Sequence, residues 1–260
     1  TYTATVTNLS AESIIISGTL GGGVLTDTAT ITFTPGTADT TTSTISVSPT
    51  SVVADGSSTS IITVQLKDGQ GNNQATGGQT IVISSTGSGS IGAVSDNGNG
   101  TYSASITNTI AEPVTITATL NSNPITDSAS VSFTSGTIST LLTLITASPL
   151  SAVANGVDSI EITLQAIDNL GNNLTNGGAD IALGQDGNAS LQPVLDNGDG
   201  TYTANLTSTI AETLTVSGTI GCDAITDTET ITFTAGPPTI SQTTISTAPS
   251  SVTANGTTSA

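Results

Sequence analysis

Apolar and polar residues alternate over short stretches along most of the chain. Between residues 160 and 166, four apolar side chains are separated by Glu161, Thr163 and Gln165. An alternation with period two predicts a half-buried β-strand. Similar stretches occur near residues 145–147, 181–183, 191–194, 202–206, 214–220 and 225–233. The last of these predicts a single strand that runs from Ile225 to Phe233.

Turn signals separate these stretches. The segments 168–173 (DNLGNN) and 196–200 (DNGDG) are rich in Asn, Asp and Gly, which favour tight turns and hairpins. Pro149 is expected to end or bend the first strand at a sheet edge. About seven short strands in 100 residues, with no helical periodicity, predict an all-β fold: an antiparallel two-sheet sandwich of immunoglobulin type.

The whole pattern repeats with a period of 100 residues. Equivalent positions hold the same residue type in each copy, as at Tyr2, Tyr102 and Tyr202, at Phe33, Phe133 and Phe233, and at Pro49, Pro149 and Pro249. We therefore expect residues 1–36 to be the C-terminal part of a repeat, 37–136 and 137–236 to be complete repeats, and 237–260 to open a further one. The sequence predicts a segment of a longer tandem array whose sandwiches lie end to end.

Composition excludes several classes of function. The chain has 260 residues, a formal net charge of −18, one basic residue, Lys67, and no histidine. Nucleic-acid binding needs a cluster of basic side chains, so we expect no nucleic-acid partner. No apolar run approaches the length of a membrane span, so we expect no membrane insertion in this segment. Without histidine, and without paired catalytic carboxylates outside turns, we expect no enzymatic activity.

Five segments of the copy 137–236 carry a family resemblance. They are residues 151–156 (SAVANG), 168–172 (DNLGN), 177–181 (GGADI), 196–204 (DNGDGTYTA) and 230–234 (TITFT). In this order they resemble the bacterial immunoglobulin-like repeats of invasin/intimin-type surface adhesins. The resemblance implies a stalk domain of a long extracellular protein. We also expect no cofactor. The near-absence of Lys and Arg is the point at which this chain departs from that family.

Acidic residues in the turns raise the question of calcium. Hard cations take carboxylate and carbonyl oxygens, and Asp196 and Asp199 lie in one turn. The turn does not match an EF-hand loop, because Gly198 stands at its third position, so turn geometry is the favoured interpretation. Calcium between domains, held by Asp168 or Asp186 with a carboxylate of a neighbouring copy, is the alternative.

Asp27, Asp127 and Asp227 recur before the last predicted strand. Their phase matches that of buried residues, so we expect each carboxylate to point inward or to cap the sheet end. There it would accept backbone N–H bonds from a neighbouring loop. A ligand or proton site is the alternative, but no partner base is visible. Cys222, the one thiol, stands where other copies have Gly22 and Ser122, so we expect no structural role for it.

Glycosylation is a further hypothesis. Six asparagines lie in N-x-[ST] sequons, namely Asn8, Asn99, Asn173, Asn188, Asn205 and Asn255. Asn205 lies in the predicted strand 202–206, on the face opposite Tyr202. It is therefore expected to be the most accessible of those in strands.

Two functional hypotheses follow from these features. The first is a structural stalk or filament segment of a long extracellular, cell-surface adhesin-like protein. Its partners would be neighbouring copies of the repeat and, in a fibre, other chains. The alternative is a carbohydrate- or protein-binding adhesion module that uses loop or inter-domain surfaces. Such sites need exposed aromatic residues, and the three Tyr and three Phe all stand at positions with core phase. The sequence therefore favours the stalk.

Overall fold

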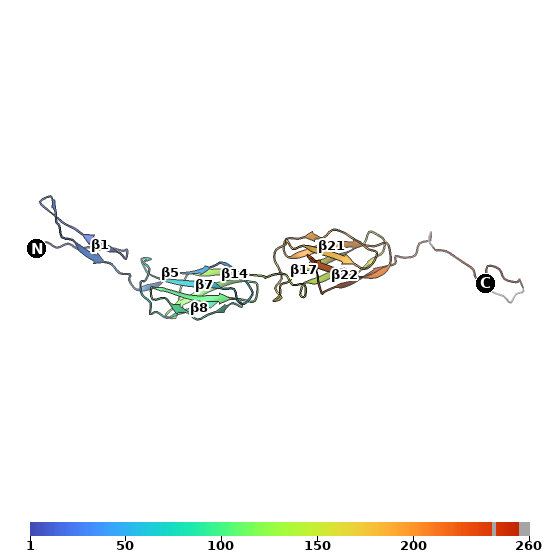
Figure 1. Cartoon of the computed structure of the whole chain (residues 1–260), viewed down its shortest axis with the longest axis horizontal. Coiled ribbons are helices and arrows are strands. Elements are labelled where there is room, and N and C mark those ends of the chain that lie inside the picture. The colour runs from blue at the N-terminus through green and yellow to red at the C-terminus, as the bar shows by residue number, and fades with distance from the viewer. Residues whose placement is uncertain (241–242, 255–260) are drawn as a thin grey trace. The chain divides into compact units, whose positions relative to one another are not determined.

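A computed structural model describes residues 1–240 and 243–254. The described residues form strands and turns and no helix, as the alternation predicts (Figure 1). None of them belongs to a helix that could span a membrane. The chain divides into two compact units. The first comprises residues 1–143, 165–178 and 198–201, and the second comprises residues 144–164, 179–197 and 202–260.

The first unit contains a two-sheet sandwich. In one sheet, β7 (Ser60–Asp68) lies between β5 (Ala38–Ser48) and β11 (Thr101–Thr107), and β11 also pairs with β9 (Ser90–Ile91) and β10 (Ser95–Asp96). The order in the other sheet is β13-β12-β14-β6, with β8 paired to β12. These strands are β6 (Ser51–Val53), β8 (Ile81–Ser85), β12 (Pro113–Leu120), β13 (Asn123–Pro124) and β14 (Ala129–Thr134).

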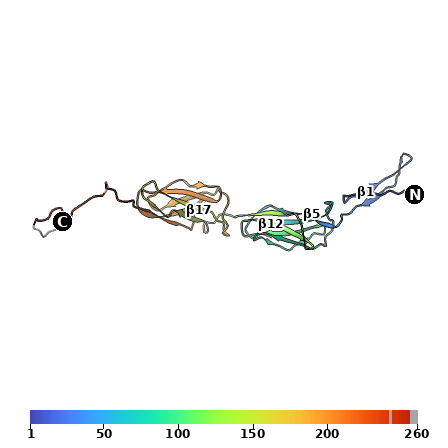
Figure 2. The same cartoon turned by 180° about the vertical axis from the view of Figure 1, so that it is seen from behind.

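The strands of residues 144–234 repeat this topology, and Figure 2 shows both sandwiches from behind. One sheet contains β15 (Leu144–Ser148), β17 (Ser159–Gln165), β19 (Ser190–Leu191), β20 (Leu195–Asp196) and β21 (Thr201–Thr207). The other contains β16 (Ser151–Val153), β18 (Ile181–Gln185), β22 (Glu212–Ile220), β23 (Asp223–Ala224) and β24 (Glu229–Thr234). Each copy thus has seven longer strands, the expected number, and three strands of two residues.

One pairing in each sandwich is parallel, whereas the sequence predicted antiparallel sheets. After Pro149 the chain leaves the sheet of β15 and joins the other sheet as β16. There β16 pairs in parallel with β24, with Ser151 opposite Thr232. The strands β6 and β14 pair in the same way. Pro149 therefore ends the first strand as expected, but the strand after it adds an edge to the second sheet.

The predicted strand from Ile225 to Phe233 is wrong at its start. The structure places β23 before it and begins the last strand at Glu229. Ile225 is buried and its N–H donates to the Gly218 carbonyl at 2.9 Å. The chain then breaks from the ladder around Asp227, because that carboxylate is used by a strand of the other sheet. Alternation alone cannot separate such a break from a continuous strand.

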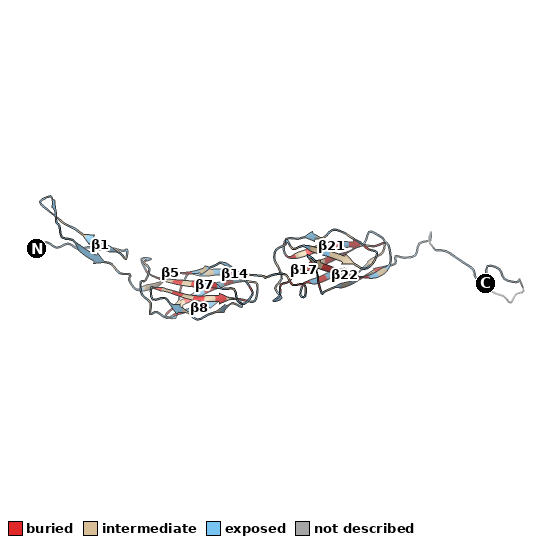
Figure 3. Ribbon diagram, in the orientation of Figure 1, coloured by how far each residue is buried: buried red, intermediate tan, exposed pale blue. Residues whose placement is uncertain are grey.

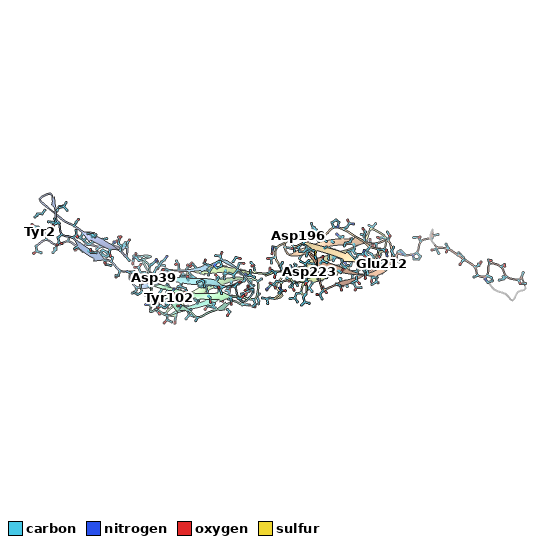
Figure 4. All side chains as sticks on the ribbon, in the orientation of Figure 1. Tyr2, Asp39, Tyr102, Asp196, Glu212 and Asp223 are labelled. Atoms are coloured by element: carbon cyan, nitrogen blue, oxygen red, sulfur yellow. The ribbon has the colours of Figure 1, made fainter. Side chains whose placement is uncertain are left out.

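Each complete sandwich has a core of aliphatic residues around one Tyr and one Phe. Figure 3 shows the buried residues on the strands of both sandwiches. Tyr102, Tyr202, Phe133 and Phe233 are each exposed by 2% or less, which confirms the predicted strand phase. Tyr2 differs, because it is 100% exposed (Figure 4). Residues 1–36 carry no counterpart of β7 or β8 to cover it.

The N-terminal segment forms two small sheets of its own. Here β1 (Ser13–Ile16) pairs with β4 (Ala29–Thr32), and β2 (Thr19–Leu20) pairs with β3 (Gly23–Val24). Most of their side chains are exposed. The assignment of residues 1–36 to the end of a repeat stays a prediction.

Candidate functional site

The turn that follows β17 is built around a buried carboxylate. Asp168 is 2% exposed, and its Oδ1 accepts the N–H groups of Leu170 and Asn172, both at 2.9 Å. Its Oδ2 accepts the N–H of Gly136 at 2.8 Å and the side-chain amide of Asn172 at 2.9 Å. One carboxylate therefore fixes the turn 168–172 and holds the connecting segment at Gly136. All of these residues belong to the first compact unit.

The first copy contains the same arrangement. Asp68 is also 2% exposed and accepts the N–H groups of Gln70, Asn72 and Gly36 at 2.8–3.0 Å. The hydrogen bonds from the Asn72 side chain and from Gly36 lower the pKa of Asp68 to about 2. Burial raises the pKa of Asp168, but hydrogen bonds from Gly136 and Asn172 outweigh it and leave this pKa below its usual value. Both groups are therefore charged at neutral pH.

The second acidic turn joins two segments that stand apart in the sequence. Asp96 accepts the N–H of Gly78 at 2.6 Å and that of Gly98 at 2.9 Å. A Cβ at Gly77 would collide with the Asp96 carboxylate, so a larger residue there would displace this carboxylate from its hydrogen bonds. The G-G segment and the D-N-G hairpin are therefore two halves of one structural feature.

The buried tyrosine completes this feature. The Tyr102 hydroxyl accepts the N–H of Gln79 at 2.8 Å, and the Tyr202 hydroxyl accepts that of Ala179 at 2.9 Å. The ring fills the core while the hydroxyl satisfies a backbone donor next to the G-G segment. The T-Y part of the motif is thus explained by packing together with a specific hydrogen bond.

The four calcium candidates are spread over three segments of the chain, at Asp168, at Asp186 and at Asp196 with Asp199. Asp168 is used as described above, and the Oδ1 atom of Asp186 accepts the Thr215 N–H at 2.7 Å. Asp199 accepts the N–H and the hydroxyl of Thr201 at 3.0 and 2.6 Å, while Asp196 lies on β20. Within residues 1–240 and 243–254, no three acidic or thiol side chains gather as a metal site would require. Turn geometry stays the favoured prediction for these residues, and calcium stays the untested alternative.

Asp127 and Asp227 accept backbone N–H bonds as predicted, but the donors lie on a strand of the other sheet and not in a loop. The Oδ2 atom of Asp127 accepts the Ile45 N–H, and that of Asp227 accepts the Ile145 N–H, both at 2.8 Å. In each copy, a carboxylate before the last strand thereby holds the first strand of the opposite sheet. Asp27 instead accepts the N–H of Thr28, because residues 1–36 contain no such first strand.

The sequons differ in environment. The side chains of Asn8 and Asn188 hydrogen-bond to Glu12 and Glu212, and Asn99 accepts from Thr101. Asn173 and Asn205 are exposed, with Asn205 in the middle of β21. Asn255 lies outside the described residues. Cys222 is an exposed free thiol. Glycosylation of these asparagines stays a prediction.

The role of Asn72 and Asn172 was missed at the level of sequence. The predicted turn 168–173 includes Asn172, yet its side chain and that of the equivalent Asn72 each also reach a backbone segment more than 60 residues away. The available signal was the identical D-x-x-G-N spacing in both copies.

Comparison with known proteins identifies the family. Residues 39–136 and 139–236 each match the family model of invasin domain 3. Among solved structures, the chain is similar to InvD of Yersinia pseudotuberculosis, with 28% identity and a TM-score of 0.61 over 80% of this chain and 62% of that one. It is similar in fold to invasin, a bacterial integrin-binding protein, with 24% identity and a TM-score of 0.59 over 88% of this chain and 47% of that one.

An Escherichia coli adhesin, FdeC, shares the fold at 20% identity and a TM-score of 0.51, over 87% of this chain and 74% of that one. The chain spans less than two thirds of the length of invasin and of InvD. The matched family is an immunoglobulin-like domain type of adhesins rather than an enzyme family. Because its model matches both complete copies, the chain belongs to the invasin domain 3 family.

Proposed function

We propose that the chain is a structural segment of a stalk in a long, extracellular, cell-surface adhesin. One observation carries this proposal: successive copies are connected by very few residues. The strand β14 ends at Thr134, and Ile138 already forms a bridge with Asp168. A connection of this length, held at Gly136 by the Asp168 carboxylate, leaves little free chain between copies. A connection with few free residues favours an extended array of copies over copies that fold back on one another.

The composition and burial of the copies support the same role. The aromatic residues of both complete copies lie in the cores, where they stabilise the sandwiches and are out of reach of a ligand. The chain belongs to a family of invasin domains, invasin is a bacterial integrin-binding protein and FdeC is an adhesin, and these similarities support a cell-surface location as our proposal for this chain.

A second candidate, a protein-binding module, is favoured by the surface of the copy 137–236. Several exposed residues there are apolar where the first copy has Thr, Ser or Gln, namely Leu144, Leu150, Val157, Leu170 and Leu195. Exposed apolar residues can mark interaction sites when they gather into a patch. These positions are spread over β15, β20 and three loops, so the stalk is the preferred proposal.

Small-angle X-ray scattering on the full chain tests the stalk. We expect the distance distribution of a rod, with a single early maximum and a long tail. The same profile is expected from 0.1 to about 0.5 M salt, because connections this short should resist folding back. A compact, symmetric distance distribution would contradict the stalk and would favour the second candidate, a protein-binding module that uses the apolar residues of the copy 137–236.

A further inference from the structure

We propose that the turns 68–72 and 168–172 are docking turns, with which each copy of the repeat binds the copy before it. The partner surface is the loop that precedes β12 in the earlier copy, here called the acceptor loop, at residues 109–112. Residues 9–12 are its equivalent before β1. Both docking turns and both of these acceptor loops belong to the first compact unit.

The contact is made by one asparagine side chain. The Asn172 Oδ1 atom accepts the N–H of Ala111 at 2.9 Å, and its Nδ2 donates to the carbonyl of Thr109 at 3.0 Å. A primary amide carries both a donor and an acceptor, so it can satisfy a backbone N–H and a backbone C=O at once. Neither Asp nor Ala can make both bonds.

The docking turn is prepared for this contact by its own aspartate. The Asn172 Nδ2 also donates to Asp168 Oδ2 at 2.9 Å, so both of its hydrogens are used. The same Asp168 oxygen accepts the N–H of Gly136, in the segment that connects the copies. The asparagine is therefore held in its binding orientation before it meets the acceptor loop, which reduces the entropy lost on docking.

The acceptor loop is also held in shape by its own side chains. The Ile110 N–H donates to Asn108 Oδ1 at 3.0 Å, and the Asn108 amide donates to Glu112 at 2.9 Å. These bonds leave the Ala111 N–H and the Thr109 carbonyl for the docking turn. Both partners are thus preorganised, each by an Asn–carboxylate pair within its own copy.

The same contact occurs at the preceding position in the chain. The Asn72 Oδ1 atom accepts the Ala11 N–H at 2.9 Å, and its Nδ2 donates to the Leu9 carbonyl at 2.8 Å. Asn8 and Glu12 pair within that loop at 2.8 Å. Leu9 replaces Thr109 without affecting the bond, because only the backbone is recognised. Docking of this kind allows any copy to follow any other.

An internal comparison supports the assignment. The segment 209–212 has the same sequence as 109–112, Thr-Ile-Ala-Glu, but no further D-x-x-G-N turn follows it in this chain. Ala11 and Ala111 are half-buried, whereas Ala211 is exposed. The burial of this alanine therefore accompanies the docking turn, and the residue before the loop also differs, because Ser208 stands where the other copies have Asn8 and Asn108. The inference concerns how copies recognise each other and stands whether or not the array serves as a stalk.

Amide hydrogen exchange by NMR on the full chain tests the proposal without any substitution. We expect the N–H groups of Ala11 and Ala111 to exchange at least about tenfold more slowly than that of Ala211, since only the first two have an asparagine acceptor. Equal exchange at all three alanines would overturn the proposal.

Substitution then assigns each effect to one side chain. Asn172→Ala is expected to accelerate exchange at Ala111 about tenfold and to leave Ala11 unchanged, whereas Asn72→Ala should do the reverse. Asn173→Ala is the matched control, because Asn173 is the next residue, is exposed, and pairs with Ile167 through its backbone; it should change neither. Unchanged exchange at Ala111 in a folded Asn172→Ala chain would also overturn the proposal.

Discussion

At the scale of single residues, the same motif residues recur at the same spacing in each copy because their side chains bind backbone groups. Tyr202 is buried in the core, and its hydroxyl accepts the N–H of Ala179 beside the G-G segment. In the first copy, Asp96 accepts the N–H of Gly78 and so holds the equivalent G-G segment from the hairpin that precedes β11. Each of these side chains closes a loop between segments about 20 residues apart, so the motif residues stabilise the sandwich jointly.

Replacement of Tyr202 separates packing from hydrogen bonding. Tyr202→Phe keeps the ring but leaves the Ala179 N–H without its partner, so the free energy of unfolding should fall by about 1–3 kcal/mol. Tyr202→Ala also removes the ring and should cost about 3–5 kcal/mol. Urea denaturation of the full chain measures both. Tyr2→Phe is the control and should have no effect, because Tyr2 is fully exposed. Equal losses for Phe and Ala at position 202 would contradict this division.

At the scale of elements, the two sheets are tied together at the edge strand β15. The Ile145 N–H on this strand donates to Asp227, a residue of the segment that enters β24 in the opposite sheet. A free N–H on an edge strand is a site for unwanted pairing with other chains. The Asp227 carboxylate therefore joins the two sheets and also accepts the hydrogen bond of an N–H group on the edge strand.

Removal of this tie should destabilise the second sandwich. Asp227→Ala leaves the Ile145 N–H without its charged acceptor, and a loss of about 1.5–3 kcal/mol in the free energy of unfolding is expected. Asp223→Ala is the matched control, since Asp223 is exposed on β23 and should tolerate the change (Figure 4). Circular dichroism during urea unfolding gives the comparison. If the two variants lost the same amount, Asp227 would have no special role.

The elements also show what the sequence could predict. The strands with strict alternation, such as β17 and β21, were predicted because one face of each is buried. The parallel pairing of β16 was not predicted, because the alternation of apolar and polar residues does not show the direction in which a three-residue strand pairs. The docking role of Asn172 was missed for a related reason. Its partners are backbone groups 61 and 63 residues away. Every residue has the same backbone groups, so the sequence does not show which of them a side chain will bind.

At the scale of the whole molecule, two electrostatic effects oppose each other as the pH falls. The chain carries 19 acidic residues against one basic residue, so mutual repulsion destabilises the folded state at neutral pH and weakens on acidification. Hydrogen bonds from neighbouring N–H and hydroxyl groups lower the pKa of several carboxyl groups, in particular Asp39, Asp55, Asp68, Asp96, Glu112 and Asp199. Each such group favours the folded state only while it is ionised.

The sign of the second effect follows from the direction of these shifts. In the unfolded chain the carboxyl groups bind protons near pH 4, whereas in the folded chain they bind them at lower pH. Their stabilisation is therefore complete above about pH 4 to 5 and is lost as the pH falls through the folded values, which for Asp68 lie near 2. Repulsion acts in the opposite sense, and over distances longer than about 10 Å it is screened by salt.

Salt should therefore separate the two effects. At low ionic strength we expect the urea midpoint of the full chain to rise as the pH falls from 7 to about 4.5, because repulsion is relieved, and then to fall steeply between about pH 4 and 2. In about 0.5 M sodium chloride the rise should disappear, because the Debye length is then only about 4 Å, while the fall should persist, because direct hydrogen bonds are not screened. A fall that disappeared with salt would mean that long-range charge, and not the carboxylates fixed in the turns, sets the acid stability of the array.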